Sequence, residues 1–127
     1  MTRALVRPLL LVALAAVLAA VAGCARQVHR SAHNAVVDVT IDEYSLTPTD
    51  ITVAHGGRLT IRVHNKGVLA HNLAVMRARL IVARSATIDH GASTALTVDL
   101  KPARYRLISS LSDDDVLGIA GGLRVRR

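Results

Sequence analysis

The sequence has almost no cysteine and very few aromatic residues. Its 127 residues include one cysteine, two tyrosines and no phenylalanine or tryptophan. A single thiol, Cys24, excludes an intramolecular disulfide, so aliphatic side chains must hold the folded chain together by packing. Two isolated tyrosines, Tyr44 and Tyr105, leave no platform on which nucleic-acid bases could stack. We therefore expect no nucleic-acid partner.

Recognisable catalytic motifs are also missing. The chain contains no Gly-x-Ser-x-Gly nucleophile motif, no metal-hydrolase spacing and no phosphate-binding glycine loop. Ser109, Ser110, Asp113 and His71 include the residue types of a hydrolytic triad, but nothing in the sequence indicates an oxyanion hole. We therefore expect the protein not to be an enzyme.

The one long apolar run lies at the N-terminus. Arg3 and Arg7 precede an uninterrupted series of Leu, Val and Ala at 9–22, and Gly23 leads to Cys24. A positive start, a short apolar core and a small-residue cleavage site are typical of a secretory signal, whereas a spanning helix needs about 20 apolar residues. The segment predicts a helical signal peptide at 1–23 that is cleaved from the mature chain. An uncleaved anchor helix is the alternative.

The residues around the predicted cleavage site, Val21-Ala22-Gly23-Cys24, resemble the lipobox of bacterial lipoproteins. The resemblance implies that Cys24 is lipidated and becomes the first residue of the mature protein. Two or more acyl chains, such as palmitate, hold a protein stably on a membrane. We therefore expect a protein anchored through Cys24 to the extracytoplasmic face of the cell membrane.

Residues 24–35 are polar and basic and show no periodicity, so we expect a lipidated flexible tether there. His29 and His33 in this segment either bind copper weakly or are ordinary linker residues. The whole chain has a formal charge of +7 at pH 7. Such an excess could suit an anionic membrane or cell-envelope polymer, but a solvated face without a partner explains it as well.

Alternating apolar and polar residues dominate 36–127. The pattern is clearest at 37–41, 59–63 and 96–100, and turn-forming residues separate such runs. No stretch after the signal has the 3.6-residue spacing of an amphipathic helix. These features predict one all-β domain, a β-sandwich of about seven or eight short strands.

Three parts of this domain resemble the cupredoxins, the plastocyanin-like copper proteins. They are the segment from Tyr44 to Asn65, the pair His71-Asn72 and the closing segment 103–125. The resemblance covers about residues 36–127 and implies a Greek-key β-sandwich. It also places His71 where the family carries its first histidine ligand.

The same resemblance implies a copper site that this sequence cannot complete. A type 1 site needs two imidazoles, a thiolate and a weak axial thioether. The family's cysteine position falls on Ser109, its second histidine position on Asp114 and its methionine position on Ile119. Residues 109–120 contain no Cys, His or Met at all. We therefore expect no type 1 copper site and no bound cofactor.

Two functional hypotheses follow. In the first, the protein is a membrane-anchored, non-catalytic binding or interaction module of the cell envelope. Its contact surface would be the former metal end, formed by His71, Gly67–Ala70 and a loop that includes Ser109, Leu111, Asp113, Val116, Leu117 and Ile119. The apolar members of this loop either form an exposed patch or fill the space that the copper ligands vacated.

In the second hypothesis, the protein binds or transfers copper or zinc. His71 would act with Asp114, or the tether histidines would act, because imidazole and carboxylate groups suit either metal. The sequence names no protein partner under either hypothesis.

Overall fold

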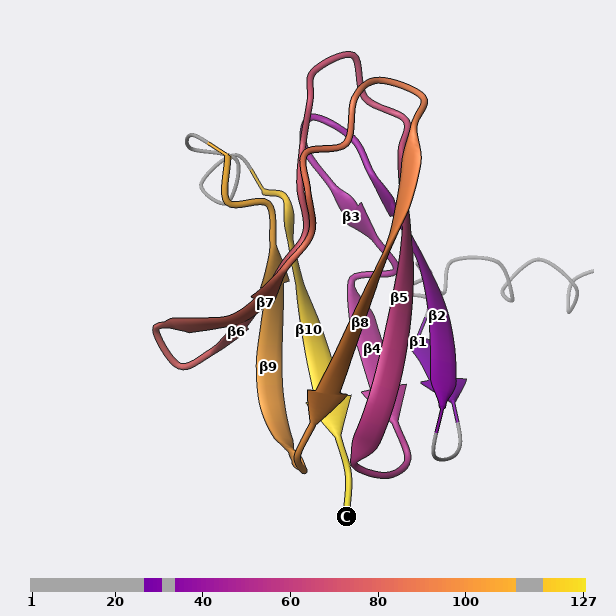
Figure 1. Cartoon of the computed structure of the whole chain (residues 1–127), viewed down its shortest axis with the longest axis vertical. Helices are drawn as coiled ribbons and strands as arrows, with labels where there is room; N and C mark the ends of the chain where they lie inside the picture. The colour runs from indigo at the N-terminus through magenta and orange to yellow at the C-terminus, as the bar shows by residue number, and fades with distance from the viewer. Residues whose placement is uncertain (1–26, 31–33, 112–117) are drawn as a thin grey trace, which may run out of the picture.

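Two β-sheets packed face to face make up the computed structural model, which describes residues 27–30, 34–111 and 118–127 (Figure 1). The first sheet contains, in spatial order, β1 (Gln27–Arg30), β4 (Asp50–Val53), β10 (Ala120–Val125), β9 (Ala103–Ile108), β6 (Ala74–Arg77) and β7 (Leu80–Arg84). The second contains β3 (Leu46–Thr47), β2 (Ala35–Ile41), β5 (Gly57–Asn65) and β8 (Ser93–Leu100). The described residues include no helix of the length and apolarity needed to cross a membrane.

The predicted all-β sandwich is confirmed. Strands distant in sequence lie side by side, because β2 pairs in parallel with β5 and β4 pairs in parallel with β10. The described residues form ten strands rather than the expected seven or eight. The additional strands include the two-residue β3 and β1, neither of which has a long alternating pattern.

Strand β1 lies inside the segment 24–35 that the sequence analysis assigned to a flexible tether. It pairs in parallel with β4, with Gln27 opposite Asp50 and Arg30 opposite Val53. Buried Ala35 then begins β2. The difference has a physical reason: an edge strand is held by backbone hydrogen bonds, which any residue except proline can make, so no apolar alternation is required. Residues 1–26 and 31–33, with the predicted signal and Cys24, lie outside the described part of the chain.

The core lies between the sheets and is almost entirely aliphatic. In the four-stranded sheet, Val37 stands opposite Ile61 and Val39 opposite Val63, and all four are at most 2% exposed. Tyr105 is the one aromatic residue in the described core, and its hydroxyl donates to the carbonyl oxygen of Lys101 at 2.8 Å. The alternation seen in the sequence therefore reports the buried face of the strands correctly.

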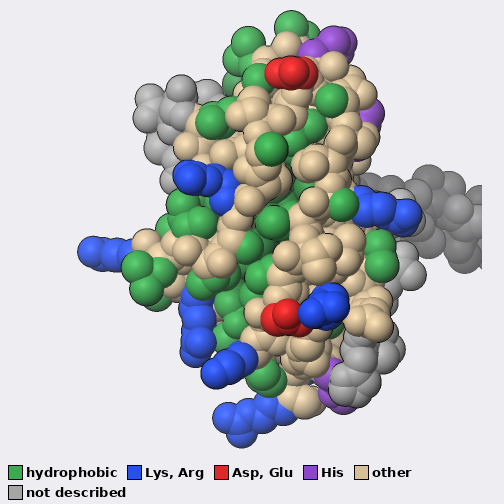
Figure 2. Space-filling model, viewed as in Figure 1, with side chains coloured by type: hydrophobic (Ala, Val, Ile, Leu, Met, Phe, Trp, Pro, Cys, Tyr) green, Lys and Arg blue, Asp and Glu red, His purple; other side chains and the backbone are tan. Residues whose placement is uncertain are grey.

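Strands β6 and β7 form a hairpin that projects from the outer edge of the six-stranded sheet (Figure 1). Its outer strand exposes Leu80, Ile81 and Val82, and hydrophobic and basic side chains meet at this projection (Figure 2). Strand β1 forms the opposite edge of the same sheet. The two edges thus point away from each other.

Candidate functional site

One buried asparagine organises the loop that leads from β5 to His71. Asn65 is fully buried, and its side-chain nitrogen donates to the carbonyl oxygens of Leu69 and Ile88, each at 2.8 Å. Its side-chain oxygen accepts from the backbone N–H of Gly67 at 2.8 Å. Leaving a buried amide without partners costs roughly 1–3 kcal/mol, so these bonds fix the shape of the loop. His71 follows, with two backbone hydrogen bonds to Ile88 at 3.1 and 2.7 Å.

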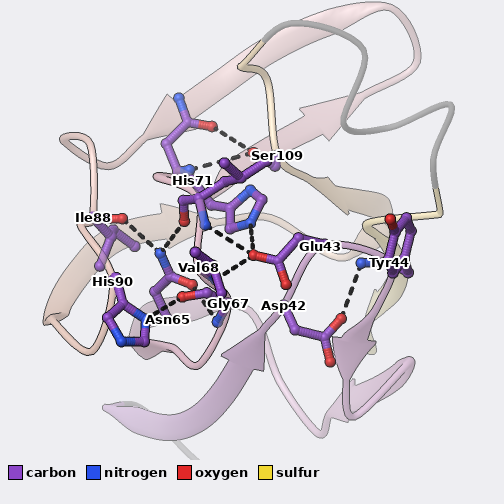
Figure 3. Close-up of polar contacts among 12 residues, drawn as sticks. Asp42, Glu43, Tyr44, Asn65, Gly67, Val68, His71, Ile88, His90 and Ser109 are labelled. Atoms are coloured by element: carbon purple, nitrogen blue, oxygen red, sulfur yellow. Dashed lines mark hydrogen bonds and ion pairs between the residues drawn. The ribbon is translucent and has the colours of Figure 1, made fainter.

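The ring of His71 faces a carboxylate that the sequence analysis did not identify. His71 is 1% exposed, and its Nε2 lies 3.8 Å from Oε1 of Glu43 (Figure 3). The same oxygen accepts the backbone N–H groups of Val68 and of Leu69, the latter at 2.9 Å. Glu43 therefore ties the loop after β2 to the His71 loop and places a negative charge beside the imidazole.

Hydrogen bonding keeps two neighbouring carboxyl groups ionised. The backbone N–H of Leu69 is the main cause that lowers the pKa of Glu43, with smaller contributions from Val68 and His71. The backbone N–H of Tyr44, 3.0 Å from Oδ1, lowers the pKa of Asp42. A carboxylate that accepts backbone N–H bonds is stabilised in its charged form, so both groups favour the folded state when ionised.

The end of β9 is tied to the residue after His71. Ser109 is 1% exposed, and its Oγ accepts the backbone N–H of Asn72 at 3.3 Å. The side-chain oxygen of Asn72 accepts the backbone N–H of Ser110 at 2.7 Å, and its side-chain nitrogen donates to the Ser110 hydroxyl at 3.0 Å. A hydroxyl therefore lies beside His71-Asn72, at the position where the resemblance places the family's thiolate.

Three further predicted site residues have described positions. Ile119 is fully buried in the core, so it fills the interior and does not contribute to an exposed patch. Leu111 is half-buried, and the backbone of His29 belongs to β1. The remaining predicted residues lie outside the described part of the chain: Cys24, His33, Asp113, Asp114, Val116 and Leu117.

Other apolar side chains are exposed at this end of the sandwich. Val68 is 76% exposed and Leu69 is 62% exposed, on the loop that Asn65 and Glu43 hold in place. Tyr44, next to Glu43, is 73% exposed. The segment Gly67–Ala70 was expected to belong to the contact surface. Tyr44 was not, because it lies far from His71 in the sequence and only the fold brings it near.

Few described side chains at the His71 end of the sandwich could coordinate a metal ion. Among the residues with described positions, no group of three His, Cys, Asp or Glu side chains is arranged to hold a metal ion. His71 and Glu43 form one imidazole–carboxylate pair, whose nitrogen and oxygen atoms suit zinc or copper(II) rather than the thiolate chemistry of a blue-copper centre.

The chain belongs to the cupredoxin-like domain family, whose model matches residues 11–118. No curated protein matches the sequence. Among solved structures, the chain is similar to reduced auracyanin from Roseiflexus castenholzii, with a TM-score of 0.66, 14% identity and coverage of 76% of this chain and 100% of that one. It is also similar to auracyanin A, a "blue" copper protein from Chloroflexus aurantiacus, with a TM-score of 0.64, 18% identity and coverage of 73% and 99%.

A third similar structure is a multicopper oxidase from Campylobacter jejuni. Its TM-score is 0.60 at 11% identity, and the match covers 76% of this chain and 31% of that one. Identities this low establish the fold alone. Because the fold is shared by proteins of different activity, function must be argued from the site.

The Glu43 carboxylate predicts an acid-dependent loss of stability. Its folded pKa is below the ordinary value of 4.5, so its contribution is complete above that value and is lost as the pH falls through the folded pKa. Glu43→Gln should therefore flatten the decline in unfolding free energy as the pH falls from the ordinary value of 4.5 through the lower folded pKa. Denaturant unfolding followed by circular dichroism measures this. Asp42→Asn is the comparison, because it should remove a separate part of the decline. A Glu43→Gln curve parallel to wild type would contradict the role of this carboxylate.

Proposed function

We propose that the protein is a lipid-anchored cupredoxin-like module that acts in the cell envelope by binding a partner, without a type 1 copper site and without catalysis. The observation that carries this proposal is the pairing at the end of β9. There Ser109, beside His71-Asn72, supplies a hydroxyl bonded to the backbone of Asn72. A serine hydroxyl does not provide the copper–thiolate bond on which a type 1 centre depends.

The burial of Ile119 supports the same proposal. A buried isoleucine occupies the segment where the family resemblance places the axial ligand, and it belongs to the hydrophobic core. An aliphatic side chain has no atom that can coordinate a metal. At this position, Ile119 therefore contributes core packing to the domain instead of a metal ligand.

We place the contact surface at the His71 end, on Val68, Leu69 and Tyr44. These side chains are exposed, while the backbone that carries Val68 and Leu69 is fixed by the side chains of Asn65 and Glu43. A rigid backbone reduces the entropy lost on binding, and exposed apolar and aromatic side chains supply much of the energy of protein interfaces. Loops at the end of a rigid β-sandwich are also where such folds commonly carry function.

A photo-crosslinking amino acid tests this surface. Placed at Val68, it should give a discrete adduct in intact cells, because the side chain would be covered by the partner. The matched control is His55, an exposed residue in the turn between β4 and β5 at the other end of the sandwich. Adducts detected by immunoblot at position 55 but not at 68, or at neither position, would contradict the proposed surface.

The anchor has its own test. Cys24→Ser should abolish lipid attachment and either release the protein from membranes or leave the precursor unprocessed, because no thiol then remains in the chain. Membrane fractionation and mass spectrometry of the mature N-terminus measure both outcomes. Ser31→Ala, a small change seven positions further on, serves as the control. Unchanged retention and an unchanged N-terminus in Cys24→Ser would favour an uncleaved anchor helix.

The second candidate function, copper or zinc binding, is supported by the Glu43 carboxylate 3.8 Å from His71. Asp114 and the tether histidines remain alternative donors. Calorimetric titration of the full chain with Cu²⁺ and Zn²⁺ separates the two candidates. The proposed module should show no tight site and no intense blue colour. One tight equivalent in wild type that is lost in both His71→Ala and Glu43→Gln, but kept in the exposed control His64→Ala, would establish the metal site instead.

A further inference from the structure

The outer face of the six-stranded sheet carries a groove of about 350 Å³ that neither functional hypothesis uses. It runs across β4, β10 and β9. Arg104, Arg124 and Arg126 line it, together with Thr52, Gly122 and Asp50. We call this feature the arginine groove. Lys and Arg side chains also gather along the side of the molecule that carries β9 and around the C-terminus (Figure 2).

Strand register forces two of these arginines together. The inward side chains of Tyr105 and Leu123 are buried, so Arg104 and Arg124 point outward. The two arginines are direct partners in the antiparallel β9–β10 pair. Like charges directly opposite each other in a sheet are destabilising. An anion bound between the two guanidinium groups would offset this repulsion.

The local carboxylates do not neutralise this charge. Within the described residues, the ion pairs between arginine and a carboxylate are those of Arg58 and Arg62, both on the other sheet. Among the described residues, Asp50 is the only acid that lines the groove, so three arginines and one carboxylate leave a local charge of +2. The groove is therefore suited to an anionic ligand.

A glycine leaves room for the Asp50 carboxylate in the middle of the groove. Gly122 lies opposite Asp50 on one side and Arg106 on the other. A Cβ atom at this position would lie 2.8 Å from Oδ1 of Asp50, so any larger residue would displace the carboxylate and occupy the floor. The Asp50 carboxylate therefore occupies the space above Gly122, and an anion would bind beside it, between Arg104 and Arg124.

The groove lies close to the predicted anchor. Gln27 of β1 stands opposite Asp50, which in turn stands opposite Gly122. Two strand spacings therefore separate Gln27 from Gly122, or about 10 Å. From Cys24 to Gln27 the chain can span at most about 10 Å. A lipid on Cys24 would thus hold this face of the sheet within about 20 Å of the membrane surface.

We propose that the arginine groove binds the phosphate of an anionic phospholipid headgroup in the membrane that holds Cys24; this inference rests on the proposed anchor. Guanidinium groups bind phosphate oxygens in pairs of parallel hydrogen bonds, and anionic lipids attract basic residues near the surface. The anchor and the groove would then fix the orientation of the domain, with the outer face of the six-stranded sheet on the membrane.

A titration in neutral detergent tests the groove without relying on the lipid at Cys24. The full chain is labelled with ¹⁵N and titrated separately with short-chain phosphatidylglycerol, short-chain phosphatidylcholine and inorganic phosphate. Phosphatidylglycerol should shift the amide resonances of Thr52, Gly122 and Arg124 in a saturable way. Arg104→Gln combined with Arg124→Gln should weaken binding roughly 25-fold, because each arginine near an anionic headgroup contributes about a factor of five.

The matched control removes the same charge away from the groove. Lys66→Gln combined with Arg84→Gln changes two exposed cations, one on the loop after β5 and one on the edge strand β7, and should alter the affinity less than about twofold, because neither residue lines the groove and exposed charges beyond about 8–10 Å are screened. If both double variants weaken phosphatidylglycerol binding equally, the effect depends on net charge alone, and this result would overturn the arginine groove as a specific site.

The remaining outcomes separate the ligand sources. No saturable shift with phosphatidylglycerol would overturn the groove as a binding site. Inorganic phosphate that binds as tightly as phosphatidylglycerol would assign the site to a free anion and overturn the membrane assignment. Equal binding of phosphatidylcholine would overturn the requirement for an anionic lipid. None of these results depends on Cys24, so failure of the groove and failure of the anchor remain distinguishable.

Discussion

The His71 end of the sandwich depends on two buried asparagine side chains. Asn65 holds the loop after β5 by bonding to backbone groups of Gly67, Leu69 and Ile88. Asn72 connects that loop to the end of β9 through Ser109 and Ser110. The Asn65 and Asn72 side chains are buried, so each partner that either amide loses leaves an uncompensated polar atom. The position of His71 and the exposure of Val68 follow from these amides.

This arrangement explains how an end without a complete copper-ligand set can remain ordered. In a type 1 centre, bonds to a metal draw the ligand-bearing loops together. Here, within the described residues, side-chain amides, the Glu43 carboxylate and the burial of Ile119 connect the same part of the fold. Such contacts form without a metal. They leave the side chains of Val68 and Leu69 exposed.

The sequence was sufficient to predict the sandwich, because alternation in β2 and β5 directly reports which side chains are buried. It was insufficient for β1, whose pairing uses backbone groups that leave no apolar pattern. The family resemblance also predicted that His71 and Ser109 lie close together. Glu43 could not be predicted, because its contact with His71 spans 28 positions and depends on how the two loops pack. The pair of opposed arginines, Arg104 and Arg124, required the strand register.

The placement of the two proposed surfaces has a geometric consequence. The arginine groove lies on the outer face of the six-stranded sheet, whereas Val68 and Leu69 lie at one end of the strands. A sheet that rests on a membrane by its outer face directs its strand ends sideways, along the membrane. A partner that contacts Val68 from that direction would itself be close to the same membrane. The proposed anchor, groove and contact surface would together favour a membrane-bound partner over a freely diffusing one, since a tethered partner also meets the domain at a higher effective concentration.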